Sequence, residues 1–115
     1  MAIAPTFPER LRAAAAHTEL DQGDIAYLVG ANPRTVARWL ADDGSAPRTE
    51  VRRKALEIIA VLEQLSGVLT PQAGHDWLFS PNPMIGHEKP IDLLAEGEWR
   101  KVLGMITAMA EGVFV

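Results

Sequence analysis

The chain has 115 residues, enough for one domain or for two very small modules that share a core. Hydrophobic residues make up 48% and charged residues 23%, as in ordinary folded proteins, and the absence of cysteine excludes disulfides and thiolate metal sites. The net charge of −4 argues against a nucleic-acid partner, but residues 34–54 carry six basic and three acidic side chains. This basic island is therefore +3 and the remaining sequence −7, a segregation that suggests two partners unless it is only a solvated helix face.

The sequence shows no sign of export or of membrane insertion. No basic segment followed by a long apolar run stands near the amino terminus, and no stretch approaches about eighteen uninterrupted apolar residues. We therefore expect neither a signal peptide nor a membrane span. A cytoplasmic location is the expectation, and the lack of cysteine fits a reducing compartment.

Capping signals predict three short helices in the first third of the chain. Thr6 and Glu9 form a capping box at the start of the first helix. Asp21 begins the second helix and Gly30 ends it. Asn32-Pro33 restarts a helix at once, with a cap and a first-position proline in the right order.

Periodic apolar residues predict the remaining helices. The segment 48–67 is the strongest, and shorter helices begin at Pro71 and Pro90 on either side of a proline-rich turn. The last helix, residues 98–112, carries one apolar stripe: Trp99, Val102, Leu103, Ile106, Met109 and Ala110. Because strand-like alternation is nowhere sustained, the predicted fold class is all-α, with six or seven short helices and no internal repeat.

The composition changes near residue 67. The basic island lies before this point, whereas the proline-rich turn and most of the large aromatic residues follow it. We therefore divide the chain into an N-terminal module, residues 1–67, and a small C-terminal helical module, residues 68–115.

Residues 22–41, QGDIAYLVGANPRTVARWLA, have the spacing of a helix-turn-helix motif. Two helices that cross steeply need a tight turn, often with glycine, and Gly30 occupies that place. Ala26 provides a small side chain where the helices approach each other. The residues expected to wedge the helices together are Ile25, Val29, Val36, Trp39 and Leu40. Two packed helices that never meet DNA are the plainer alternative.

The second helix of this motif is predicted to bind DNA. Its exposed positions would be Arg34, Thr35, Ala37 and Arg38. The amino-terminal part of such a helix enters the major groove, where arginine reads guanine, while neighbouring cations contact phosphates. The predicted DNA-binding residues are Asn32, Arg34, Thr35, Arg38, Arg48 and Arg52, with Arg53 and Lys54 as further phosphate contacts. Since such modules bind paired half-sites, a homodimer is expected.

Catalytic and metal sites find little support. The histidines His17, His75 and His87 do not have the spacing of a helical ligand pair, and no cysteine accompanies them. No serine stands in a nucleophile motif, and no glycine-rich phosphate loop occurs. We therefore expect a protein that is not an enzyme and that carries neither metal nor cofactor.

The C-terminal segment, WLFSPNPMIGHEKPIDLLAEGEWRKVLGMITAMAEGVFV, resembles the C-terminal domain of the Xre/ParS/MbcA family of antitoxins. The elements that match are Trp77-Leu78, the Pro81-Asn82 turn, Gly86, Pro90 with Leu93-Leu94, Gly97 and the closing helix with Gly112. The ending AMAEGVFV is most similar to the mycobacterial MbcA branch. The helix-turn-helix also lies where this family has one, so the resemblance covers nearly the whole chain.

The resemblance implies a function. Members of this family are paired with a RES-domain toxin that consumes NAD, and their C-terminal segment blocks the active-site cleft of the toxin. The upstream module is implied to repress the toxin–antitoxin operon. The toxin-binding residues implied for this chain are Met109, Glu111, Gly112, Val113, Phe114 and Val115.

The last residues also favour this function on physical grounds. Gly112 can release the final helix, leaving an apolar segment whose phenylalanine would anchor in a pocket. The carboxylates of Glu111 and of the chain end could occupy positions that a phosphate group would otherwise take. Two alternatives remain: a tail that folds back over its own dimer interface or core, and a stand-alone transcription regulator whose C-terminal module only dimerises.

Overall fold

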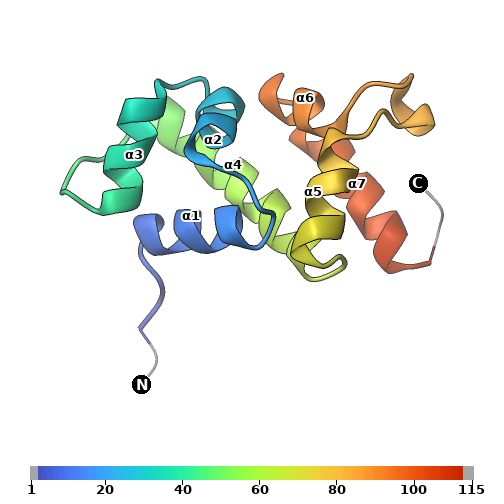
Figure 1. Ribbon diagram of the computed structural model, residues 1–115, viewed down its shortest axis with the longest axis horizontal. Helices are drawn as coiled ribbons and strands as arrows, with labels where there is room; N and C mark the ends of the chain where they lie inside the picture. The colour runs from blue at the N-terminus through green and yellow to red at the C-terminus, as the bar shows by residue number, and fades with distance from the viewer. Residues whose placement is uncertain (1–2, 113–115) are drawn as a thin grey trace.

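The structure is a computed structural model that describes residues 3–112 (Figure 1). Within these residues the chain forms seven α-helices and one short 3₁₀ turn, so the all-α prediction is confirmed. The helices are α1 (Phe7–Ala16), α2 (Gln22–Val29), α3 (Pro33–Ala41), α4 (Thr49–Ser66), α5 (Pro71–Phe79), α6 (Pro90–Ala95) and α7 (Trp99–Ala110), with the turn η1 (Pro83–Ile85) before α6.

The predicted capping residues begin the first three helices. The N–H of Glu9 donates to Thr6 Oγ1 at 3.3 Å, which completes the capping box of α1. Asp21 and Asp24 form the equivalent box at α2. Between α2 and α3, Gly30 adopts φ +71°, a left-handed conformation that glycine enters without strain, so the chain reverses within three residues.

Helix α4 runs through the middle of the molecule (Figure 1). Helices α1–α3 lie on one side of it in this view and α5–α7 on the other, and α4 packs against α1, α2, α5 and α7. Its buried residues are Ala55, Ile58, Ile59, Val61, Leu62 and Leu65. In the described part of the chain these belong to one hydrophobic cluster that includes residues from both sides of position 67. The division at residue 67 stays a prediction, and α4 supplies core to both halves.

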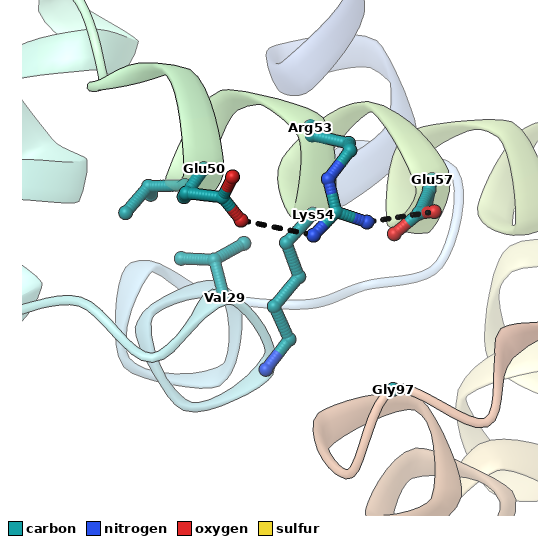
Figure 2. A pocket seen from close by; sticks show the side chains of 7 residues that line it. Val29, Glu50, Arg53, Lys54, Glu57 and Gly97 are labelled. Atoms are coloured by element: carbon teal, nitrogen blue, oxygen red, sulfur yellow. Dashed lines mark hydrogen bonds and ion pairs between the residues drawn. The ribbon is translucent and has the colours of Figure 1, made fainter.

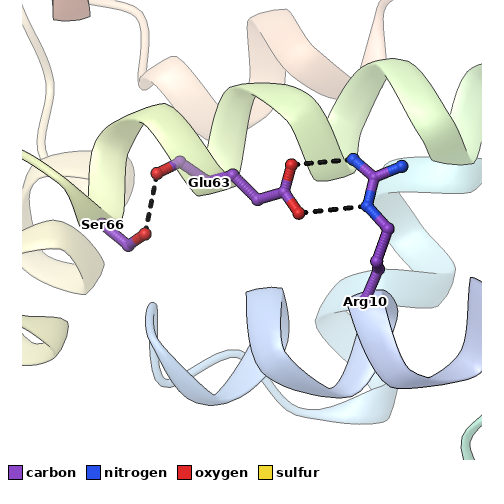
Figure 3. A network of polar contacts seen from close by, with 3 residues as sticks. All are labelled: Arg10, Glu63 and Ser66. Atoms are coloured by element: carbon purple, nitrogen blue, oxygen red, sulfur yellow. Dashed lines mark hydrogen bonds and ion pairs between the residues drawn. The ribbon is translucent and has the colours of Figure 1, made fainter. Parts of the chain in front are cut away.

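Long-range polar contacts join the helices around α4, and three of them are described next. The guanidinium of Arg10 in α1 binds both carboxylate oxygens of Glu63 in α4, with Nη2–Oε1 2.7 Å and Nε–Oε2 3.1 Å (Figure 3). The Tyr27 hydroxyl in α2 donates to Asp92 Oδ1 in α6 at 2.5 Å. Lys54 Nζ in α4 donates to the carbonyl of Ala95 at 2.8 Å, which satisfies an unpaired acceptor at the end of α6.

Three predictions of side-chain exposure or burial need correction. Thr35 and Ala37 were expected on the exposed face of α3 but are half-buried, because α3 also packs against α1. Ala110 was placed on the apolar stripe of α7 but is exposed, since it is the last residue of the helix. Met105, which the stripe omitted, is buried instead.

The proline-rich segment between α5 and α6 folds as a tight turn rather than an open loop. Asn82 is buried, and its N–H donates to the Glu88 carbonyl at 2.9 Å. Its carbonyl accepts from Ile85 and His87, while its side-chain oxygen accepts from the N–H of Met84. One asparagine thus organises the turn that leads into α6.

A helix that crosses a bilayer needs about 20 predominantly apolar residues. In residues 3–112, no helix is both long enough and apolar enough to span a membrane.

Candidate functional site

The amino-terminal end of α3 presents the first group of predicted site residues. Asn32 caps the helix by accepting from the N–H of Arg34 at 2.9 Å, so its side chain has a structural use. Val36 and Trp39 are buried on the opposite face of α3, which fixes the rotation of the helix. Arg34 and Arg38 consequently lie exposed, one turn apart.

A hollow of about 610 Å³ lies between α3 and the loop that leads to α4. Four of the six predicted DNA-binding residues line it together: Asn32, Thr35, Arg38 and Arg48. Ala46 and Pro47 of the loop form part of its wall. Arg34 and Arg52 are not among its lining residues, so the structure gathers most of the set but not all of it.

Much of the charge of the basic island is already engaged within the chain. Arg38 Nε lies 3.3 Å from Asp43 Oδ2. The guanidinium of Arg52 stands 5.1 Å above the ring of Phe7, which in turn packs edge-on against Trp39. Arg52 was predicted to contact phosphate, and its stacking on Phe7 gives it a packing role that sequence reasoning missed.

Figure 2 shows the other two engaged cations, in a pocket between α4, Val29 of α2 and Gly97. Arg53 lies between two carboxylates of its own helix, 3.0 Å from Glu50 Oε2 and 3.6 Å from Glu57 Oε2. Lys54 extends away from α4 to the end of α6. Among the contacts described for residues 3–112, Arg34 and Arg48 are the two cations of the island whose side chains bind neither a side chain nor a backbone carbonyl.

The contact between α2 and α6 changes the acidity of Tyr27. The hydrogen bond that Tyr27 donates to Asp92 raises the pKa of the phenol, and partial burial and the carboxylate of Glu96 act in the same direction. The hydroxyl therefore stays a donor throughout the physiological range, and Asp92 accepts its hydrogen bond. This contact is structural and holds α6 against α2.

The end of α7 carries the second group of predicted site residues. Met109 is half-buried and packs against the core cluster. Glu111 is exposed, and its N–H donates to the carbonyl of Thr107 at 3.1 Å, closing the helix. Gly112 has φ +83°, so the chain leaves α7 in the left-handed conformation. Val113, Phe114 and Val115 lie outside the described residues.

A second hollow, of about 500 Å³, was not anticipated from the sequence. We call it the α4 groove; its lining residues are Thr49, Arg52, Arg53, Leu56, Glu57, Ala60 and Trp99. Leu56 and Ala60 fall outside the buried stripe of α4, and this offset is the sequence signal that could have revealed the groove. Trp99, predicted to lie on the core stripe of α7, is half-buried and forms one wall.

The histidines do not converge. His75 is half-buried with Nδ1 3.3 Å from the Thr18 carbonyl, and its ring packs on Phe79 at 4.5 Å. His17 and His87 are exposed. In the part of the chain that the structure describes, no three side chains of the types that bind metals lie close enough to hold an ion.

Comparison with known proteins gives the class and the family. The chain matches no protein-family model. It is 41% identical over 92 residues to the mycobacterial cidal antitoxin MbcA of Mycobacterium tuberculosis and of Mycobacterium bovis, which is 80% of this chain and 80% of each relative. A probable mycobacterial cidal antitoxin of M. tuberculosis is 26% identical over 94 residues, covering 82% of this chain and 79% of that protein.

A solved structure agrees with these relatives. A chain in the crystal structure of the M. tuberculosis MbcT–MbcA toxin–antitoxin complex superposes with a TM-score of 0.85 at 36% identity, over 97% of this chain and 100% of that one. The protein is therefore an antitoxin homologue and not an enzyme. Within that class, the chain belongs to the MbcA family of mycobacterial cidal antitoxins, which confirms the resemblance found in its sequence.

Proposed function

We propose that this chain neutralises a RES-domain toxin of the MbcT type by binding it directly. The observation that carries the proposal is the similarity to a chain of the MbcT–MbcA complex along 97% of the present chain. A likeness of this extent, at 36% identity, covers nearly the whole chain. The toxin implied by the family consumes NAD.

The C-terminal tail is proposed to be the inhibitory element. Glu111 and Gly112 leave α7 on the surface, and neither contributes to the core cluster. The residues after Gly112 in the sequence are Val113, Phe114 and Val115, an apolar segment that a toxin cleft can receive. A phenylalanine seated in a closed pocket is the kind of anchor that dominates binding energy, and it would obstruct the entry of a dinucleotide. Met109, half-buried one turn before the exit, would border this contact.

The direct test is to mix the purified chain with the toxin and follow NAD consumption. We expect inhibition that is complete once the chain and toxin are present in the ratio found in their complex. Unchanged NAD consumption at saturating chain, with no complex in size-exclusion chromatography, would instead favour a stand-alone transcription regulator. Complex formation without inhibition would support the toxin as the partner of this chain. It would reject the proposal that the tail blocks the toxin cleft.

We also propose that the α2–α3 pair is a helix-turn-helix that binds operator DNA and represses the operon. The supporting observation is the hollow beside α3, where Asn32, Thr35, Arg38 and Arg48 are brought together next to the exposed start of the helix. The engagement of Arg38 by Asp43 and of Arg52 by Phe7 leaves Arg34 and Arg48 as the principal cations for this contact. In this arrangement Arg34 reads base edges and Arg48 binds phosphate.

Alanine substitutions distinguish these two roles. Arg34→Ala is expected to weaken specific binding by about 1–3 kcal/mol, because a base contact is lost. Arg48→Ala is expected to weaken operator and random DNA alike and to reduce the salt slope of binding by about one. Fluorescence anisotropy at several salt concentrations measures both effects.

The matched control for these variants is Arg100→Ala. Arg100 is an exposed arginine of α7 that stacks on Trp99, with its guanidinium 4.4 Å from the ring, and it belongs to a different part of the surface. Equal losses for all three variants would reduce DNA binding to a general charge effect and reject the helix-turn-helix assignment. A homodimer remains part of the proposal, since paired half-sites require one.

A further inference from the structure

We propose that Asp43 is a positioning residue for DNA recognition, which binds one edge of the Arg38 guanidinium and so holds the other edge ready to read a guanine. The proposal rests on the proposed helix-turn-helix and deepens it, because it adds Arg38 to Arg34 as a base reader and names the residue that orients it. The observation behind it is the contact between the two side chains, in which Arg38 Nε donates to Asp43 Oδ2 at 3.3 Å.

This ion pair uses only part of the Arg38 side chain. A guanidinium has five N–H donors, one on Nε and two on each terminal nitrogen. Within residues 3–112, the hydrogen bond described for this side chain is the one from Nε. The two terminal nitrogens together form the fork that can donate to O6 and N7 of one guanine. Binding by Asp43 is therefore compatible with base reading by the same arginine.

The end of α3 fixes Asp43 beside Arg38. The helix ends at Ala41, and Asp42 follows it at φ +54°. The N–H of Asp42 donates to the carbonyl of Trp39 at 3.1 Å, and the N–H of Asp43 donates to the carbonyl of Arg38 at 3.4 Å. The backbone and the side chain of Asp43 thus both contact Arg38, and the buried Trp39 fixes the rotation of this turn.

The loop after α3 restrains the carboxylate of Asp43 as well. Its Oδ1 accepts from the N–H of Ser45 at 2.9 Å, while its Oδ2 accepts from Arg38. With both oxygens bound, the carboxylate has little freedom to rotate. An arginine held by such a group loses less conformational entropy when it binds DNA, because part of that entropy is already lost in the free protein.

The surroundings of Arg38 fit a contact with DNA. It lines the hollow beside α3 together with Asn32, Thr35 and Arg48, and it lies one turn after the exposed Arg34. Its side chain is 59% exposed, against 41% for Asp43, so the arginine is the more accessible member of the pair. The other possible role of Asp43 is to screen the charge of Arg38, which would weaken binding to every DNA sequence alike.

Asp43→Asn distinguishes positioning from screening. Asparagine has one acceptor oxygen where aspartate has two, so it can keep the hydrogen bond from Ser45 while its NH₂ group faces Arg38 Nε, which is also a donor. We expect the ratio of operator to random-DNA affinity to fall by about fivefold or more, the discrimination that a bidentate base contact supplies. Random DNA should bind slightly more tightly, because a negative charge is removed.

The measurement is fluorescence anisotropy at fixed salt, with a duplex from the promoter region of the operon and a random-sequence duplex of equal length. Asp42→Asn is the matched control, since it removes the same charge from an exposed side chain that is not the partner of Arg38. Asparagine tolerates the left-handed conformation of this position. The control should change the affinity for random DNA in the same direction and leave the ratio unchanged. Circular dichroism checks that both variants keep their helices.

A double-mutant cycle shows whether Asp43 acts through Arg38. Arg38→Ala should lower the affinity ratio at least as far as Asp43→Asn does. In the Arg38→Ala background, Asp43→Asn should lower the ratio no further. A fall of equal size with and without Arg38 would overturn the proposal, because the substitution would then act through the loop.

The same data separate this inference from the proposed function. A wild-type chain that prefers the operator, with an unchanged ratio in Asp43→Asn, would leave the helix-turn-helix assignment in place and make Asp43 a screening charge. A wild-type chain that binds the operator no more tightly than random DNA would reject the helix-turn-helix assignment, and this inference with it.

Discussion

Replacing Leu62 with alanine is expected to lower the free energy of unfolding by about 2–5 kcal/mol, the range for leucine truncation in a packed core. Leu62 is fully buried, with 0% of its surface exposed, in the second half of the helix that both halves of the molecule share. Its removal leaves a cavity that α4 cannot close without moving its other contacts. Chemical denaturation followed by circular dichroism measures the change.

The matched control is Leu56→Ala, the same truncation in the same helix. Leu56 is half-buried and lines the open α4 groove, so its loss should cost about 1 kcal/mol or less in the monomer. Both proteins must be compared at concentrations too low for self-association. Equal costs at the two positions would contradict the assignment of inner and outer faces to α4.

The shape of the Leu62→Ala transition also tests the modules 1–67 and 68–115. Because buried residues from both ranges form one cluster, we expect a single cooperative transition, shifted as a whole. Two separated transitions, with only one displaced by the substitution, would mean that the modules fold independently.

Deletion of residues 112–115 is expected to abolish inhibition of the toxin while leaving the helical body folded. Helix α7 ends at Ala110, and the exposed Glu111 and Gly112 add nothing to the core, so the truncation should not change the unfolding transition. The expected loss is large because the deletion removes the proposed aromatic anchor. Phe114→Ala alone should weaken inhibition by about thirtyfold, equivalent to about 2 kcal/mol for a binding hot spot.

Three measurements on the truncated chain show which activity the tail supports. NAD consumption reports inhibition, size-exclusion chromatography reports complex formation, and operator binding at fixed salt reports the other proposed activity. Lost inhibition with retained operator binding would mean that the tail inhibits the toxin and is not needed for DNA binding. Full inhibition by the truncated chain would contradict the plug and move neutralisation to the helical surface around Trp77 and Trp99.

The resemblance to the MbcA family could be read from the sequence because it rests on residues close together in the chain. The turn at Pro81-Asn82, the glycine Gly97 and the end of the last helix are local features. In the structure, Asn82 and Gly97 form backbone hydrogen bonds to residues close in the chain, which build the turn and the end of α6.

The starts of the first three helices were likewise accessible, because the groups that begin a helix bind neighbours within about four residues. Thr6, Asp21 and Asn32 each cap a helix through a contact of this kind. Apolar periodicity in α4 identified most of its buried face for the same reason, since one turn of helix repeats every 3.6 residues.

Which charged side chains are bound by partners within the chain was decided only by the tertiary structure. From composition the basic island was a cationic surface, but Arg52 stacks on Phe7 and Lys54 binds the carbonyl of Ala95, 41 residues away. Arg10 with Glu63, and Tyr27 with Asp92, are likewise 53 and 65 residues apart. Sequence alone determined which helices this chain forms, because helix formation depends on near neighbours. Which charges and which apolar side chains remain available to a partner depends on how those helices pack, and that is a property of the folded chain.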